Sequence, residues 1–356
     1  MTSPLARAAA FCDRFGLSAP ILLAPMAGAC PPSLSTAVAS AGGMAAAGAL
    51  LMAPDEIGRW MREFRSASNG AVQINLWIPD PPPVRDAARE AKVRRFLSGW
   101  GPEVPAEAGD AAPPDFAAQC EALLAAGPTV VSSIMGVYPP DVVSQLKARG
   151  IRWFATVSTV AEAIEAEAAG ADVVVAQGAE AGGHRGAFRA AEAERRAVGL
   201  FSLLPSVVDA VRVPVVATGG IADGRGVAAA LALGASAVQV GTAFLRSPEA
   251  KTHQAWADAL AGTRPEDTIV TRAFSGRAGR AIATDYALAA TSPDAPAPAP
   301  YPVQRGLTGA MRTEAARTGD LSRMQAWAGQ SAALARTEPA GEIVRRLWSE
   351  AQAILG

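Results

Sequence analysis

A glycine-dense turn around a histidine is the part of this sequence whose residue types point to chemistry. The run AQGAEAGGHRG, residues 176–186, holds His184, one of only two histidines in the 356-residue chain. Its glycines let the backbone adopt positive φ and approach a bound molecule closely, and an imidazole titrates near neutral pH. The pattern predicts a ligand-binding turn with Gln177 and Glu180 as its polar ends. The alternative is a flexible surface loop with an incidental histidine.

Two further glycine turns follow apolar runs later in the chain. ATGG occupies residues 217–220, ahead of a helical segment that begins near Asp223, and QVGT occupies residues 239–242. Closely spaced backbone N–H groups and a helix N-terminus favour an anion. Together the turns predict a phosphate site, although glycines at strand ends can also serve only as turn residues.

The elements that position these turns are short apolar runs alternating with alanine-rich helical segments. Each run is too short and too continuously apolar for a half-exposed antiparallel strand. Eight such βα units predict an α/β protein with a TIM (β/α)8 barrel, whose active site lies at the carboxyl ends of the strands. An open doubly wound sheet is the alternative. The eight expected strands are residues 21–27, 44–50, 72–78, 129–135, 153–157, 172–176, 214–218 and 237–240.

The predicted barrel covers residues 1–250, and two segments depart from its repeat. A proline-rich and charged insertion, residues 79–114, follows the third strand and either covers the active site or acts as a solvated spacer. Residues 251–356 form a mixed, mainly helical extension that packs on the barrel. Within the extension we expect a strand at 267–274, a Pro/Ala-rich linker at 294–302, and helices at 307–319, 321–336 and 339–355.

Composition narrows the class of protein. The chain is 50% hydrophobic and 18% charged with a net charge of −1, which gives no electrostatic footprint for nucleic acid or a membrane surface. No run reaches the roughly 18 apolar residues of a membrane span. Three widely spaced cysteines indicate neither a disulfide framework nor a metal site. We therefore expect a soluble cytoplasmic protein with small-molecule partners and no metal, and a homo-oligomer remains open.

Six motifs together resemble the nitronate monooxygenase family, formerly called 2-nitropropane dioxygenase. The resemblance spans nearly the whole chain and implies an FMN-containing TIM barrel that oxidises alkyl nitronates with molecular oxygen to carbonyl compounds and nitrite. The motifs are APMAG (24–28), NLW (75–77), AQGAEAGGHRG (176–186), the long stretch from ATGG to TAFL (217–245), YPVQRGLT (301–308) and WAGQ (327–330).

The resemblance also implies roles for single residues. His184 matches the family's active-site histidine, either as the base that takes the α-proton of a neutral nitroalkane or, when protonated, as the group that orients a nitronate anion. The implied cofactor contacts are Pro25, Met26 and Ala27 beside the flavin ring, Asn75, Gln177 and Gln239 as polar contacts, and Gly183, Gly219, Gly220, Gly241 and Thr242 around the phosphate.

Substrate choice is less defined by these motifs. Many family members carry a histidine after the fourth strand, whereas this chain has Ile134 there. Tyr301, with Arg305 four residues on, is a candidate to contact an anionic substrate, and packing of the tail onto the barrel is the alternative role for Tyr301. Arg185 either adds charge to the site or is a solvent-facing loop residue, and Glu180 is expected to fix the turn by accepting backbone N–H groups.

Two other functions stay open at this stage. Related flavin-dependent enoyl reductases and quinone reductases share the EAGGH turn, so an NAD(P)H-dependent flavin reductase of enoyl thioesters or quinones is the main alternative. A non-catalytic barrel that binds a phosphorylated ligand is the other. Anaerobic flavin reduction by NADH or NADPH, and the absence of flavin, would distinguish them.

Overall fold

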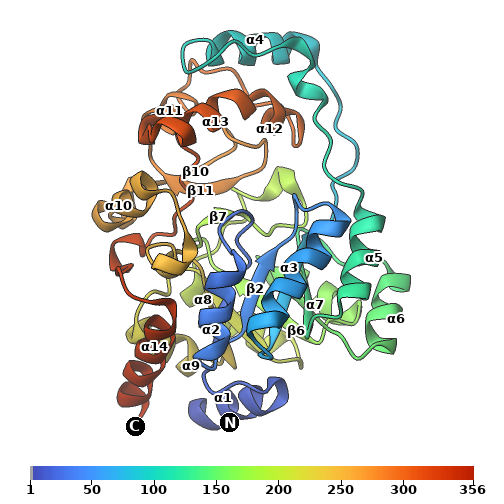
Figure 1. Ribbon diagram of the computed structural model, residues 1–356, viewed down its shortest axis with the longest axis vertical. Helices are drawn as coiled ribbons and strands as arrows, with labels where there is room; N and C mark the ends of the chain where they lie inside the picture. The colour runs from blue at the N-terminus through green and yellow to red at the C-terminus, as the bar shows by residue number, and fades with distance from the viewer. Residues whose placement is uncertain (1–2) are drawn as a thin grey trace.

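The centre of the molecule is a parallel eight-stranded barrel, as the sequence predicts (Figure 1). The computed structural model describes residues 3–356. The strands follow the order β1-β9-β8-β6-β5-β4-β3-β2, and a bridge between Leu22 and Met44 joins the first to the last. The barrel strands are β1 (Ile21–Leu23), β2 (Ala45–Gly48), β3 (Val72–Trp77), β4 (Val130–Ile134), β5 (Arg152–Val157), β6 (Val173–Gln177), β8 (Val215–Thr218) and β9 (Ala237–Val240).

Helices cover the outside of the barrel and begin where the sequence places capping residues. Thr159 and Asp223 accept backbone N–H bonds at the starts of α7 and α9. Gly170 and Gly234 take positive φ just past the ends of the same helices, where glycine has no steric penalty. The helices that follow the strands are α2 (Pro32–Ser40), α3 (Pro54–Ala67), α5 (Phe116–Ala126), α6 (Pro140–Ala148), α7 (Val160–Ala168), α8 (Leu200–Ala210) and α9 (Gly224–Ala232).

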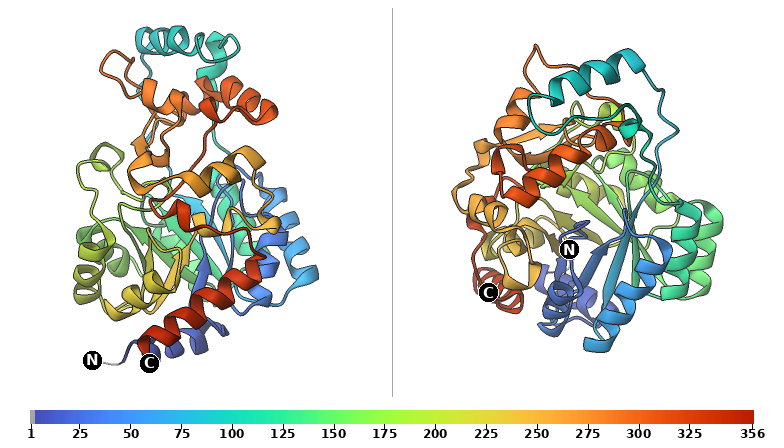
Figure 2. Two further views of the ribbon diagram at one scale, coloured as in Figure 1. Left: turned by 90° about the vertical axis from the view of Figure 1, so that its left-hand side faces the viewer. Right: turned by 45° about the horizontal axis from the view of Figure 1, so that its top comes forward.

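The last helix of the chain occupies the eighth helical position of the barrel. After β9 the chain continues into the short 3-10 helix η3 (Thr242–Phe244) instead of a full helix. The gap is filled by α14 (Ala340–Leu355), which packs between α9 and α2 and lies beside α1 (Pro4–Phe15) (Figures 1 and 2). Its apolar face, including Ile343 and Leu347, is fully buried in the main core. The barrel is therefore complete only with the C-terminus in place.

A second, smaller core forms a cap above the carboxyl ends of the strands. The insertion contributes Val93 and Leu97 of α4 (Ala87–Leu97) to this core, and the C-terminal extension contributes Phe274 and Tyr286. The cap also holds α10 (Gln254–Gly262), α11 (Asp285–Ala289), α12 (Val303–Leu307) and α13 (Gly309–Thr318). Insertion and extension thus pack on each other over the barrel mouth.

A three-stranded antiparallel sheet ties the cap to the barrel. It has the order β10-β11-β7, with β10 (Thr268–Thr271), β11 (Gly279–Ile282) and β7 (Gly183–His184). Strand β10 lies inside the expected strand at 267–274. Because β7 belongs to the glycine turn after β6, the sheet fixes that turn from above.

The expected helix at 321–336 is wrong. That segment holds only the 3-10 turns η6 (Leu321–Arg323) and η7 (Ala332–Leu334). Between these turns, backbone groups bond to the barrel loops: Gly329 N–H donates to Thr242 Oγ1 at 3.0 Å, and Gln330 N–H donates to Glu180 O at 3.0 Å. Tertiary contacts here override an amphipathic pattern.

Two features are absent from the described residues. Within residues 3–356, no helix is long and apolar enough to cross a bilayer. The same residues contain no cluster of three or more His, Cys, Asp or Glu side chains arranged to hold a metal ion.

Candidate active site

The residues assigned to the cofactor converge on one face of the barrel. All of them lie at or just past the carboxyl ends of strands, beneath the cap. They come from β1 (Pro25, Met26, Ala27), β3 (Asn75), β6 and its turn (Gln177, Gly183), β8 (Gly219, Gly220) and β9 (Gln239, Gly241, Thr242).

The loop after β1 is held from inside by a buried thiol. Met26 N–H donates to Cys30 Sγ at 3.3 Å, and Sγ donates to Ala24 O at 3.3 Å. Burial raises the pKa of Cys30 to about 12, so the thiol keeps the proton that this second bond requires. A Cβ at Gly48 would lie 2.6 Å from Ala27 N, which means that only glycine lets β2 approach the loop so closely.

Amide side chains line the barrel interior below this face. Gln73 Nε2 donates to Leu23 O at 2.9 Å and to Gln239 Oε1 at 3.0 Å, and Asn75 Nδ2 donates to Ser132 Oγ at 3.1 Å. Each bond fixes the rotamer of a buried side chain. A side-chain amide has two N–H donors, so Asn75 keeps one for a ligand.

Gln177 fixes the glycine turn from the end of β6. Its Nε2 donates to His184 O at 3.1 Å, and its Oε1 accepts Gly186 N–H at 2.8 Å. One N–H of its amide then remains for a ligand. Glu180 accepts Leu200 N–H at 2.9 and 3.0 Å, which confirms its expected role in holding the turn.

Arg185 is a structural residue, and the alternative of a solvent-facing loop residue is wrong. Its side chain is buried under the turn, where Nη1 donates to Gly178 O at 2.6 Å and Nη2 donates to Gln177 O at 3.1 Å. Buried backbone carbonyls at the end of β6 need donors, and the guanidinium supplies two of them.

The two glycine turns after β8 and β9 leave backbone donors free. Gly219 and Gly220 take φ of +111° and +70°, and β8 and β9 pair directly, so Gly241 lies next to them. Among the described residues, no acceptor is bonded to the N–H groups of Gly219, Gly220 or Gly241. Half-buried, unpaired N–H groups at adjacent strand ends make these turns a candidate anion site.

The WAGQ segment of the C-terminal extension closes one side of this anion site. Ser331 Oγ donates to Gly220 O at 2.6 Å, and Gly329 N–H donates to Thr242 Oγ1. A Cβ at Gly329 would lie 2.9 Å from Glu180 O, and a Cβ at Gly182 would lie 2.5 Å from Gly329 N. These contacts leave room only for glycine at both positions and explain the glycine in WAGQ.

His184 stands between two indoles at the top of this face. Its ring lies 4.6 Å from Trp77 and 4.7 Å from Trp327, centroid to centroid, and edge-on to each. Its Nε2 lies 2.7 Å from Ser275 Oγ. Strand β7 carries the histidine and Gly279 of β11 pairs with it, so the imidazole is held from the barrel side and from the cap side.

Ser275 Oγ has two possible acceptors for its single proton. It lies 2.7 Å from His184 Nε2 and 3.2 Å from Arg277 O, and it accepts Arg277 N–H at 3.3 Å. With the serine proton on Arg277 O, His184 donates from Nε2–H and its lone pair lies on Nδ1, and this is the tautomer that we propose. The pKa of His184 is lowered to about 3. Burial is the main cause, and the nearby guanidiniums of Arg277 and Arg305 contribute the rest. This lowered pKa favours a neutral imidazole at physiological pH, and the protonated form that would orient a bound nitronate stays a prediction.

We expect this shift to appear in the pH dependence of stability. Between the folded pKa of about 3 and the ordinary value of 6.5, the unfolded chain binds a proton at His184 that the folded chain does not bind. Acidification through this window therefore favours unfolding. The thermal midpoint of the wild type should fall more between about pH 7 and about pH 5 than that of His184→Asn. Equal falls would contradict the depressed pKa.

Positive charge near His184 comes from two arginines. Arg277 is 4% exposed and pairs with Asp80 at 3.1 Å, but its Nη1 has no partner. Arg305 is half-buried and has no ion pair among the described residues, and burial lowers its pKa. The buried hydroxyl of Tyr301, whose ring lies 5.4 Å from Trp77, also lacks a partner. These unpaired donors favour a bound anion beside the histidine.

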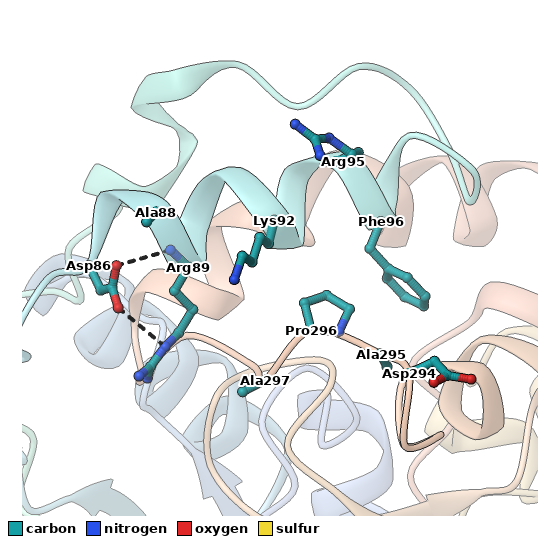
Figure 3. Close-up of a pocket in the computed structure, with 10 residues that line it drawn as sticks. All are labelled: Asp86, Ala88, Arg89, Lys92, Arg95, Phe96, Asp294, Ala295, Pro296 and Ala297. Carbon is teal, nitrogen blue, oxygen red and sulfur yellow. Dashed lines mark hydrogen bonds and ion pairs between the residues drawn. The ribbon is translucent and has the colours of Figure 1, made fainter.

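Two hollows open on the cap. One, of about 680 Å³, lies between α4 and residues 294–297 (Figure 3). It is lined by the basic side chains of Arg89, Lys92 and Arg95 on α4, and by Asp86, the N-cap residue of that helix. No residue of the cofactor or histidine cluster lines it. The other, of about 440 Å³, reaches Tyr301 and Trp77, and Trp77 contacts His184.

Comparisons with known proteins agree with this geometry. A sequence model of the nitronate monooxygenase family matches residues 10–350. The chain belongs to this family. The nitronate monooxygenase of Paraburkholderia phytofirmans is 38% identical over 341 residues, covering 94% of this chain and 93% of that protein. The solved structure of nitroalkane oxidase from Streptomyces ansochromogenes superposes with a TM-score of 0.87 at 37% identity, covering 98% of this chain and 100% of the other.

A second solved structure shares the fold at lower identity. FabK from Thermotoga maritima superposes with a TM-score of 0.75 at 28% identity and covers 97% of this chain and 96% of its own. The family resemblance and the TIM barrel predicted from the sequence are confirmed by these matches.

Sequence reasoning missed several residues of this candidate site. Ser275 contacts the histidine, and Arg277, which pairs with Asp80, lowers its pKa, but none of the three was singled out. Trp77 and Trp327 lie inside motifs but were given no role in the site. The histidine, glycine turns and Tyr301 carried a visible signal, whereas an isolated serine and arginine in the tail did not. Only the pairing of β7 with β11 brings that tail to His184.

Proposed function

We propose that this member of the nitronate monooxygenase family binds FMN and oxidises alkyl nitronates with molecular oxygen to carbonyl compounds and nitrite. The observation that carries the proposal is the cluster above the barrel mouth. Arg277 and Arg305 are close enough to lower the pKa of His184, and Trp77 contacts both His184 and Tyr301. Arg277 Nη1 and the Tyr301 hydroxyl have no partner, and free backbone N–H groups lie at the barrel face below. The names of the relatives support the same chemistry.

The residues fit FMN at the phosphate end and along the ring. Free N–H groups of Gly219, Gly220 and Gly241 would hold the phosphate, with Thr242 and Gly183 beside them. A Cβ placed on Gly183 would meet no atom within 4 Å, which leaves space for a ligand at that turn. The loop of Pro25, Met26 and Ala27 would support the ring, and the amides of Asn75, Gln177 and Gln239 would hold polar atoms.

The protein's own contribution is to bind, orient and deprotonate the substrate. When bound, FMN supplies the electron-transfer and oxygen chemistry. Tyr301 Oη and the guanidiniums of Arg277 and Arg305 would hold the anionic nitro oxygens. With a neutral nitroalkane, Nδ1 of His184 would take the α-proton while Ser275 keeps the ring oriented.

An anion in this cluster also changes the histidine. Burial and two nearby guanidiniums depress the pKa of His184. A nitronate bound to the guanidiniums would compensate their charge and so raise that pKa towards its ordinary value. Deprotonation of the substrate and retention of the proton on His184 would therefore support each other.

Removal of Arg305 tests the anion-binding role. Arg305→Met should raise KM for a preformed nitronate about tenfold to a hundredfold, the loss expected for a hydrogen bond to a charged group, with a smaller change in kcat. FMN content should stay unchanged, since no hydrogen bond or ion pair joins Arg305 to the phosphate turns among the described residues. Arg317→Met, an exposed arginine on α13, is the matched control. An unchanged KM in Arg305→Met would refute the role.

The proposed function is tested by the cofactor and its reduction. Purified protein should release FMN on denaturation, identified by mass spectrometry, and anaerobic addition of a nitronate should bleach the flavin spectrum. Release of FAD, or the absence of flavin after reconstitution, would reject the cofactor. Bleaching by NADH or NADPH without bleaching by nitronate would establish the flavin reductase instead.

A further inference from the structure

The insertion after β3 builds a cavity that the oxidation of a small nitronate does not require. The cavity measures about 440 Å³, within the range of small-molecule pockets. Two proline-containing segments, residues 78–83 and 109–114, form its outer walls, and Phe116 of α5 lines its barrel side. Trp77 and Tyr301 stand at its inner end, where the indole also packs on the ring of His184.

The charged side chains that line the cavity already have partners. Asp80 pairs with Arg277 at 3.1 Å, and Arg85 pairs with Glu90 at 2.6 Å and with Asp110 at 2.8 Å. Gln119 donates its amide to backbone carbonyls of residues 49 and 52 at 3.0 and 2.8 Å. Apart from the unpaired hydroxyl of Tyr301 at the inner end, the walls offer mainly apolar surface. A neutral apolar group suits such a lining.

The walls are fixed in place. Proline restricts φ, so both proline-containing segments lose little freedom when a ligand binds. Arg85, two residues after the first segment, pairs with Asp110 of the second segment and with Glu90 of α4. A Cβ at Gly306 would lie 2.0 Å from Ala108 O, so α12, next to Tyr301, packs directly on the insertion. Such a preformed pocket gains affinity because little ordering is needed.

We propose that this cavity is the binding pocket for the apolar chain of the substrate, and that the enzyme therefore prefers long-chain nitro compounds to short ones. The reacting carbon and nitro group lie at His184, and the alkyl chain passes Trp77 and Tyr301 into the proline-walled pocket. The inference rests on the proposed function for the identity of the head group, while the pocket itself is defined by the insertion.

Chain-length dependence of binding tests the pocket. Linear 1-nitroalkanes from nitroethane to 1-nitrooctane, kept in the neutral form, are titrated by calorimetry without oxygen into His184→Asn, which lacks the base proposed to deprotonate them, and the variants below carry the same change. Affinity should rise about two- to fourfold for each added methylene until the pocket is full, as expected for burial of a CH₂ group. Equal affinities across the series would overturn the proposal.

Two matched variants separate the pocket from the rest of the insertion. Ala112 is exposed and lines the cavity, whereas Ala106 is exposed on the same insertion and does not line it. Ala112→Trp should weaken 1-nitrooctane binding at least about tenfold by filling the space of several methylenes, while nitroethane changes less than about twofold. Ala106→Trp should behave as wild type. Unchanged 1-nitrooctane binding in a folded Ala112→Trp variant, checked by its thermal midpoint, would also overturn the proposal.

Turnover of the corresponding nitronates keeps the two hypotheses apart. The same chain-length trend in kcat/KM, lost in Ala112→Trp, supports both the pocket and the proposed function. A binding trend that Ala112→Trp removes, without oxidation of any nitronate, retains the pocket and rejects the function. Oxidation of all nitronates with no chain-length trend in binding retains the proposed function and rejects the pocket.

Discussion

Gly220→Val is expected to abolish retention of FMN. Gly220 takes φ of +70°, and a Cβ there would lie 3.2 Å from Glu180 Cβ, so the larger side chain forces the turn after β8 away from the glycine turn after β6. The free N–H groups of Gly219 and Gly220 then no longer converge. Loss of two hydrogen bonds to a charged phosphate should weaken FMN binding more than about a hundredfold, measured by the fluorescence of free FMN titrated with apoprotein.

Backbone strain needs its own control in this experiment. A β-branched residue at positive φ costs on the order of 1–2 kcal/mol wherever it stands. Gly127 ends α5 with φ of +59° and open space around its Cβ, far from the cofactor face in the sequence and the fold. Gly127→Val should lose similar stability yet retain FMN. Wild-type FMN affinity in Gly220→Val would make the glycine turns merely structural.

The barrel could be predicted because its strands are specified locally. Runs such as residues 173–177 are buried on both faces, and a parallel strand covered by helices must be apolar throughout. Helix starts such as Asp223 are likewise specified within a few residues. The place of α14 was not predictable from its own pattern. An amphipathic helix shows which face is buried, but not that the partners are α9 and α2.

The site was predictable to the extent that its residues belong to turns. Glycines with positive φ, the strand ends and His184 are all local signals. Ser275 and Arg277 act through a contact between segments about ninety residues apart, and neither has a neighbouring motif. The role of Arg185 was ambiguous because a charged residue in a glycine turn usually faces solvent. In the structure its guanidinium donates to buried backbone carbonyls. The spacing of residues along the sequence does not show which distant segments contact each other or which buried carbonyls need a donor.

His184→Asn is expected to separate the two substrate forms. A neutral nitroalkane must lose its α-proton, and an asparagine amide cannot accept it, so oxidation of the neutral form should fall about 10²- to 10⁴-fold in kcat. A preformed nitronate needs no base and is held by Tyr301, Arg277 and Arg305 in the proposed arrangement, so its kcat should fall far less. Steady-state oxygen consumption with each form, at equal FMN content, measures both values.

The role of His184 as a base can also be tested with a Ser275→Ala variant and with the pH dependence of kcat/KM. Ser275→Ala removes the acceptor of Nε2–H and should lower oxidation of the neutral nitroalkane while sparing the nitronate, because the serine acts only through the imidazole. Since the pKa of ligand-free His184 is about 3, its base form is present throughout the range from about pH 5 to about pH 8. The kcat/KM for the neutral form should therefore show no inflection from His184 in that range. If His184→Asn left both substrate forms with wild-type kcat and KM, the histidine would have no part in the reaction, and its pairing with β11 would serve only to fasten the cap to the barrel.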